Sequence, residues 1–198
     1  MPPLFTSLSA AAILVFSASL PALAACTVPA GVTLAPDDAD RIGMLAEARS
    51  RGLAQSLRSA SAEDRALVAS LLASPAAMPE AEALPGEYRC RTIKLGGITD
   101  LTVYGWFRCA ISAQGETLDV VKRTGSQNFT GTLEAAGSGY LMVGAGHYNQ
   151  DPPNAYGADP DRNIVGCMGA LETGTLILEE PFPRFESVHD LIVFEPIR

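Results

Sequence analysis

The stretch GEYRCRTIKLGGITDLTVYGWFRCAI, residues 86–111, decides the fold class. Two runs rich in aromatic and β-branched residues flank the turn signal Gly96-Gly97, so the stretch predicts a β-hairpin. A hairpin that is symmetric about this turn places Cys90 directly opposite Cys109. Directly opposed residues of antiparallel strands have Cα atoms ~4.5–5.5 Å apart, which is within the reach of a disulfide bond. The sequence therefore predicts a Cys90–Cys109 disulfide.

A similar composition, rich in glycine, aromatic and β-branched residues, continues to the C-terminus, and turn-forming residues recur at intervals that suit short strands. Strands are expected at 86–95, 102–113, 117–123, 127–134, 139–147, 162–171, 173–179 and 187–195. Short strands with tight connections and no helices between them exclude a parallel sheet. We expect a mainly β protein, in which a single antiparallel up-and-down β-barrel of about eight strands follows two short helices. Barrel closure removes exposed edges, and a two-sheet β-sandwich is the alternative.

A helical leader and linker, residues 26–85, is expected to precede this β domain, residues 86–198. The first helix begins at Pro36, because two acidic residues follow it and the helix dipole favours negative charge in the first turn. The second begins at Ser61, where the sequence SAED matches a capping pattern. Gly43 and Gly52 weaken the first helix.

The first 25 residues contain no charged side chain. An apolar run leads to Ala22-Leu23-Ala24, which is typical of a signal peptide and its cleavage site. The run is shorter than the ~20 residues that a membrane-spanning helix needs. Leu23-Ala24-Ala25-Cys26 also matches a bacterial lipobox, in which acylation of Cys26 would anchor the protein to a membrane. We expect a periplasmic or extracellular protein, or a membrane-anchored lipoprotein.

The chain has four cysteines, and an oxidising compartment favours two disulfides. If Cys90 bonds Cys109, then Cys26 either bonds Cys167 or is acylated, with Cys167 left as a buried free thiol. Both alternatives stay open. The sequence has no C-x-x-C spacing and its two histidines lie far apart, so we predict no metal site and no cofactor.

The overall charge and the absence of catalytic motifs exclude several classes of function. A net charge of −8 argues against nucleic acid and against charge-driven docking on anionic lipids. No G-x-S-x-G run occurs, and His189 and Asp190 point to opposite faces of a strand and cannot act as a dyad. No catalytic residue is predicted. A non-enzymatic binding module for a small ligand or an envelope protein is favoured over a structural or stress-related envelope protein with an inert barrel, and a hydrolase-type enzyme comes third.

Two groups of residues are candidates for ligand binding. In the symmetric hairpin Arg91 lies opposite Arg108, and like charges so placed are unfavourable unless an anion or a carboxylate lies between them. The partner is either an external anion or an internal carboxylate, for instance Glu186 or Asp190. This first group consists of Arg89, Arg91, Trp106 and Arg108. The second consists of Tyr148 and Tyr156 in the long 148–161 loop, which is expected to be a recognition surface or an Ω-loop that covers a barrel end.

Several of these stretches resemble one family. They are Cys90-Arg91-Thr92-Ile93-Lys94-Leu95-Gly96, Trp106-Phe107-Arg108-Cys109, Thr124-Gly125-Ser126-Gln127, Val165-Gly166 and Glu186-Ser187-Val188-His189-Asp190-Leu191. In this order they resemble an uncharacterised family of bacterial exported proteins, the domain of unknown function numbered four-eight-nine-three. The resemblance covers Pro36 to the C-terminus, the helical leader included. It implies export and a shared fold, and it implies no reaction.

Overall fold

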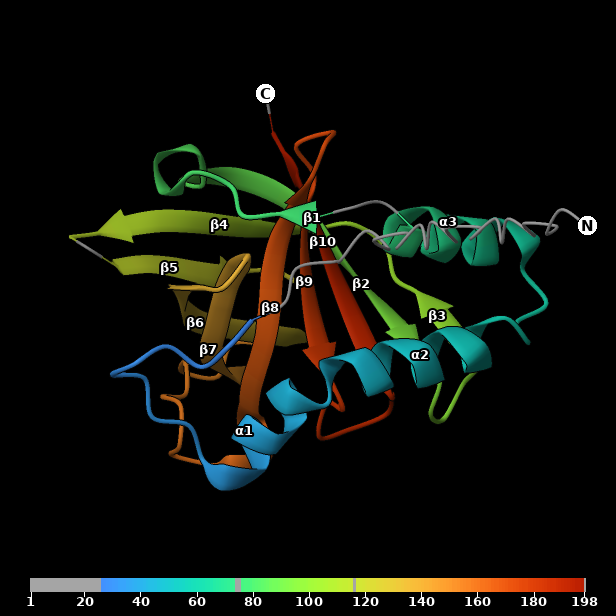
Figure 1. Ribbon diagram of the computed structural model, residues 1–198, viewed down its shortest axis with the longest axis horizontal. Coiled ribbons are helices and arrows are strands. Elements are labelled where there is room, and N and C mark those ends of the chain that lie inside the picture. Colours follow the sequence, from blue (N-terminus) through green and yellow to red (C-terminus); the bar gives the residue numbers. More distant parts are fainter. Residues whose placement is uncertain (1–25, 74–75, 116, 198) are drawn as a thin grey trace, which may run out of the picture.

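The structure is a computed structural model that describes residues 26–73, 76–115 and 117–197 (Figure 1). The expected signal peptide, residues 1–25, lies outside the described residues. Eight antiparallel strands follow one another around a closed barrel in the order β8-β7-β6-β5-β4-β2-β10-β9, and β9 pairs with β8 to close it. Their bounds are β2 Gly86–Leu95, β4 Phe107–Gln114, β5 Thr117–Lys122, β6 Gln127–Ala136, β7 Gly139–Tyr148, β8 Asn163–Leu171, β9 Leu176–Pro181 and β10 His189–Pro196. The predicted barrel is confirmed, and the sandwich alternative is wrong because the ring of pairings is complete.

Two short strands lie outside the ring. Strand β1 (Ala76–Ala77) belongs to the segment expected to be a linker and pairs with β8. Strand β3 (Leu101–Val103) pairs with β2. The strand predicted at 102–113 is therefore divided into β3 and β4, because residues 104–106 leave the ladder between them.

In the part of the chain that the structure describes, there are three helices where two were expected. They are α1 (Pro36–Gly43), α2 (Leu45–Ser56) and α3 (Ala62–Ala73), and two 3₁₀ turns, η1 (Ala81–Ala83) and η2 (Pro160–Arg162), occur later. The first predicted helix is broken at Met44, directly after Gly43, the residue type with the largest backbone entropy in a helix. The break lets α1 lie against β8 while α2 lies across β9, β10 and β2 (Figure 1). Among the described residues, no helix has both the length and the apolar character needed to cross a bilayer.

The barrel interior is packed with apolar side chains over most of its length. Inward positions alternate along every strand, and the cluster includes Cys90, Cys109, Met142, Met168 and Phe194. Leu84, which precedes the first barrel strand, is also buried in this cluster and accepts a hydrogen bond from the hydroxyl of Tyr88 at 2.7 Å. The segment around η1 therefore plugs one end of the barrel.

The hairpin register differs from the symmetric prediction by two residues. Tyr88 faces Cys109 and Cys90 faces Phe107, so Cys90 does not face Cys109 directly. The shift begins at the turn, because Ile93 faces Val103 there, whereas the symmetric register would place it opposite Trp106; the bulge at residues 104–106 recovers one residue of this difference. A shift of two keeps every side chain on its face, so Cys90 and Cys109 remain diagonal neighbours and form a disulfide with Cα atoms 5.8 Å apart.

The remaining two cysteines also meet. The sulfur atoms of Cys26 and Cys167 lie at bonding distance, and the two Cα atoms are 5.6 Å apart. This bond ties the beginning of the described chain to β8. It uses the same sulfur of Cys26 that acylation would need.

Candidate functional site

The predicted arginine cluster lies on the outer face of the barrel. The observed register places Arg89, and not Arg91, opposite Arg108, which corrects the prediction. The guanidinium groups of Arg89 and Arg91 lie 4.5 Å and 4.4 Å from the ring centroid of Trp106. Arg89 also forms an ion pair with Glu195 on the neighbouring strand β10. The cluster is thus a cation–π arrangement in which Glu195 supplies the carboxylate. Glu186 and Asp190, which the sequence suggested as partners of the arginines, contact Lys94 instead.

The two predicted tyrosines do not share a site. The hydroxyl of Tyr156 donates to Asp38 of α1 at 2.8 Å and accepts from the amide of Ala35 at 2.9 Å, so this residue fastens the long loop to the leader. Burial opposes ionisation of Asp38, but hydrogen bonds from Tyr156, Asn163 and Arg41 outweigh it and hold the pKa of that carboxyl below its usual range. Tyr148 lies at the opposite end of the loop, at a barrel mouth.

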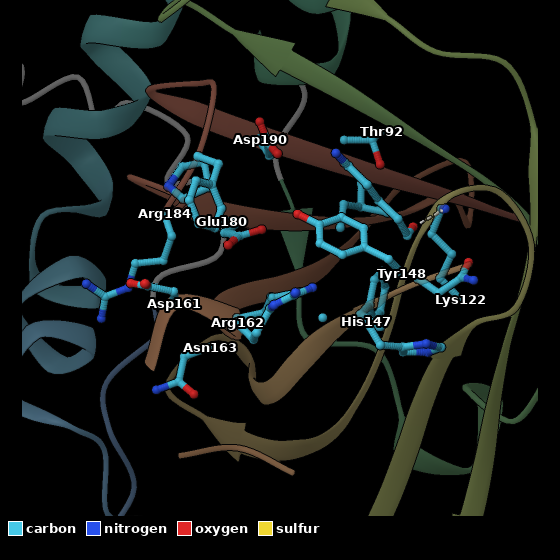
Figure 2. A pocket seen from close by; sticks show the side chains of 18 of the residues that line it. Thr92, Lys122, His147, Tyr148, Asp161, Arg162, Asn163, Glu180, Arg184 and Asp190 are labelled. Carbon is cyan, nitrogen blue, oxygen red and sulfur yellow. Dashed lines mark hydrogen bonds between the residues drawn. The ribbon is translucent and has the colours of Figure 1, made fainter. Parts of the chain in front are cut away.

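This mouth is the end of the barrel at which the inward face changes from apolar to charged. Lys94, Lys122, Glu180 and Asp190 occupy inward positions near the ends of β2, β5, β9 and β10, and each is buried. They line a cavity of about 120 Å³ together with Tyr148 and other residues (Figure 2). Buried charges are rare in proteins unless they are paired or functional, so this cavity is the candidate site.

One side of the mouth is a balanced group of charges. Asp190 faces Lys94 on one neighbouring strand and Glu180 on the other. The Nζ atom of Lys94 lies 2.7 Å from a carboxylate oxygen of Glu186 and 3.8 Å from one of Asp190, and Arg41 of α1 lies 3.0 Å from Glu180. Burial and the neighbouring Asp190 raise the pKa of Glu180 to about 7, and burial also raises the pKa of Asp190.

The other side holds Lys122. Its ammonium donates to the carbonyl oxygen of Thr124 at 2.8 Å and to that of Gln127, and it lies 4.1 Å from the ring centroid of Phe107. No ion pair joins it to a carboxylate of the described residues. Burial lowers the pKa of Lys122 to about 8, which leaves the amine charged at neutral pH.

Gly146 provides open space between the strands of the mouth. A Cβ atom at this inward position would meet its nearest neighbours at 3.6 Å, an ordinary contact distance. By contrast, a Cβ at Gly144 would lie 2.2 Å from the carbonyl oxygen of Thr130, because β6 and β7 approach closely there. Asn154 of the long loop donates to the carbonyl oxygen of Gly146 at 2.8 Å and fixes the loop at the cavity rim.

A second buried group lies outside the barrel, beneath α2. Arg49 contacts both carboxylate oxygens of Glu179, at 2.8 Å and 2.9 Å, and Nε2 of His189 lies 3.1 Å from the same carboxylate. Burial opposes ionisation of Glu179, but hydrogen bonds from His189 and Arg49 prevail and lower its pKa. His189 has no exposed surface, and α2 covers the group, so we assign it to the attachment of the helix. The described residues contain no cluster of His, Cys, Asp and Glu that could hold a metal ion.

The sequence analysis did not identify the charged residues of the mouth as a site, although the alternation along one strand indicated one of them. Lys94 continues the alternation of Tyr88, Cys90 and Thr92, which places it on the same face as the disulfide. A charged residue at the end of an apolar inward face indicates either a barrel rim or a site. Only the closed ring of strands brings Lys122, Glu180 and Asp190 to the same rim.

The comparisons with known proteins give one match. The model of a protein family described as a domain of unknown function (DUF4893) matches residues 31–194. The match begins before α1 and ends in β10, so it includes the helical leader as well as the barrel. No curated protein and no solved structure matches the chain.

Proposed function

The chain belongs to the DUF4893 family, and from the barrel mouth we propose that it is a non-enzymatic, exported protein that binds a small polar ligand. The observation that carries the proposal is the cavity at the charged end of the barrel. Its walls include four buried charged side chains that point inward, although burial of charge is costly. Small barrels commonly hold a ligand in the mouth, where polar groups fix its orientation.

The size of the cavity restricts the ligand. A volume of about 120 Å³ is close to that of an engineered apolar cavity of roughly 150 Å³ that holds benzene. It is well below the roughly 300–1,000 Å³ of pockets for drug-sized molecules. The ligand is therefore a metabolite with a single ring or a few carbon atoms, and it is much smaller than a peptide or a dinucleotide.

The cysteines and the N-terminus support the export part of the proposal. Disulfides persist in the periplasm and outside the cell, and both cysteine pairs of this chain lie at bonding distance. The uncharged segment 1–25 fits a signal peptide. The position of Cys26 beside Cys167 favours a mature chain that is held by a disulfide over an acylated one.

The test is a thermal-shift screen of the mature protein with small metabolites. A ligand at 100 times its Kd adds about 2.7 kcal/mol to the free energy of unfolding, which for a chain of this size raises the Tm by roughly 5–10 °C. Gly146→Leu places a side chain in the cavity, and Gly105→Leu adds the same side chain where a Cβ meets nothing within 4 Å.

We expect that the shift disappears in Gly146→Leu and persists in Gly105→Leu. Near-ultraviolet circular dichroism of both variants confirms that the barrel is intact. A wild-type protein that no metabolite stabilises, or a shift that Gly146→Leu leaves unchanged, would refute the proposal and favour an inert barrel.

A further inference from the structure

We infer that the mouth cavity selects a small organic anion, a carboxylate, which binds between Lys122 and Arg162. This inference rests on the proposed function, because it names the class of ligand for the same cavity. It follows from the way in which the charges of the mouth are paired, which differs between its two sides.

Lys122 is a buried cation in the wall of the cavity. An ammonium has three donors, and carbonyl oxygens of Thr124 and Gln127 take two of them. Neutral carbonyls satisfy hydrogen bonds but leave the charge uncompensated, and a buried charge is costly unless an opposite charge accompanies it. Lys122 is 5% exposed, and no carboxylate of the described residues forms an ion pair with it. An anionic ligand would supply the missing charge.

The strands beside Lys122 lead around the barrel to a second cation. Lys122 faces Phe129 in the ladder, and Phe129 faces Gly146. The next residue in that direction is Arg162, whose carbonyl oxygen is 3.8 Å from the Cβ position of Gly146. Two cationic side chains thus flank an apolar ring and a glycine, which leaves a gap between them.

Arg162 is this second cation, and it also lines the cavity. Its guanidinium lies 4.2 Å from the ring centroid of Tyr148, which holds it at the mouth, and Figure 2 shows Arg162 and Tyr148 within the cavity with Lys122 at its side. Its one carboxylate partner among the described residues is Asp159, at 3.6 Å and half exposed. A guanidinium binds a planar carboxylate through two parallel hydrogen bonds, so Arg162 can exchange this loose contact for a ligand.

The opposite side of the mouth disfavours a cationic ligand. The carboxylate of Glu180 is held by Arg41, and Asp190 by Lys94 and the hydroxyl of Ser187. A cation would have to displace these partners and leave them buried without a counter-charge. Asp161 also lines the cavity, but it is exposed to solvent, so the buried charge that lacks a counter-charge is the positive one of Lys122, although the whole chain carries a net charge of −8.

The experiment is isothermal titration calorimetry of the mature protein at pH 7 and constant ionic strength. The probes are acetate, propionate and benzoate, each with its neutral amide, and inorganic phosphate serves as a non-planar anion. We expect at least one carboxylate to bind at least about tenfold more tightly than its amide. Lys122→Met and Arg162→Met should each weaken the carboxylate about tenfold or more and leave the amide unchanged.

Arg123→Met is the matched control. It removes one positive charge from the residue next to Lys122, but Arg123 is half exposed and pairs with Glu87 outside the cavity. This variant should bind the carboxylate as the wild type does. Because Arg162 is partly exposed, its variant tests the inference even if the buried change at Lys122 impairs folding.

The outcomes separate the inference from the proposed function. If amides bind as tightly as carboxylates and Gly146→Leu abolishes both, the cavity binds ligands but the anion inference is wrong. Phosphate that binds more tightly than every carboxylate also overturns it. If all four anions and all three amides fail to bind while other metabolites bind in the thermal-shift screen, only the inference fails. If no metabolite binds at all, both fail.

Discussion

Helix α2 packs closely against the barrel at Gly52, so a substitution there has two opposite effects on the free energy of unfolding: better helix propensity and overpacking. Replacing glycine by alanine inside a helix stabilises the helix by about 1 kcal/mol on propensity alone. At Gly52 the new Cβ would lie 2.8 Å from the Cβ of His189 and 3.1 Å from that of Leu95. Neither atom can move without its strand, so the helix must lift, and overpacking of this kind costs about 1–3 kcal/mol.

A lifted helix also strains the contact beneath it. Arg49 of α2 holds the buried Glu179 through two hydrogen bonds, and a shift of the helix lengthens both. We therefore expect Gly52→Ala to lower the free energy of unfolding by about 1–2 kcal/mol despite its better helix propensity. The matched control is Gly43→Ala, where a Cβ meets nothing within 4 Å. This variant should be neutral or more stable by up to about 1 kcal/mol.

The assay is urea unfolding in a buffer without reductant, with fluorescence and circular dichroism as independent probes. A change in the midpoint at constant slope reports a change in stability. If Gly52→Ala is as stable as the wild type or more so, α2 does not lie against His189 and Leu95 as described, and the reasoning is refuted.

Three further predictions concern the same fold. Replacing both Cys90 and Cys109 by alanine opens a loop with a sequence separation of 19 and should lower the free energy of unfolding by about 3 kcal/mol, measured in urea; no loss would mean that the bond does not form. Arg49→Met should cost about 3–5 kcal/mol because it leaves the buried Glu179 without its arginine, and a neutral result would contradict that burial. Burial raises the pKa of Glu180 from 4.5 to about 7, so its contribution to stability is present below pH 4.5 and lost as the pH rises through 7. Relative to Glu180→Gln, the wild type should therefore lose stability between pH 5 and pH 8, and parallel pH profiles in thermal unfolding would be the contrary result.

The strands and the Cys90–Cys109 bond could be predicted from the sequence because both depend on local alternation. A period of two fixes which face a side chain occupies, and the disulfide needs only that the two cysteines share a face. The register could not be predicted, because it depends on where the turn is centred and on the bulge at residues 104–106, and the glycines of this stretch fix neither. This is why the pairing of Arg91 with Arg108 was wrong while the disulfide was right.

The candidate site could be predicted only in part, because it is assembled by closure of the barrel. Tyr148 was identified from its loop, but Lys122 and Glu180 lie on strands that become neighbours of one cavity only when β9 pairs with β8. The outer cluster around Trp106 could be predicted as a candidate site because its residues are close in sequence. Residues that converge from distant strands leave no such trace in a single sequence.

The break between α1 and α2 shows a similar limit. Gly43 indicates a weak point in the predicted helix, but the same is true of Gly52, at which the helix continues. The difference is tertiary, because Gly52 is needed for close contact with the barrel while nothing contacts the Cβ position of Gly43. Propensity alone cannot separate the two roles.

The central claim is that the ligand enters the barrel mouth, and a backbone NMR titration of the mature, ¹⁵N-labelled protein with benzoate tests it most directly. The account predicts saturable shifts of the amide signals of Thr92, Gly146 and Ile192, which line the cavity, and constant signals for Leu118 and Leu133 at the plugged end. Saturable shifts confined to the outer cluster around Trp106, with the cavity signals unmoved, would contradict it.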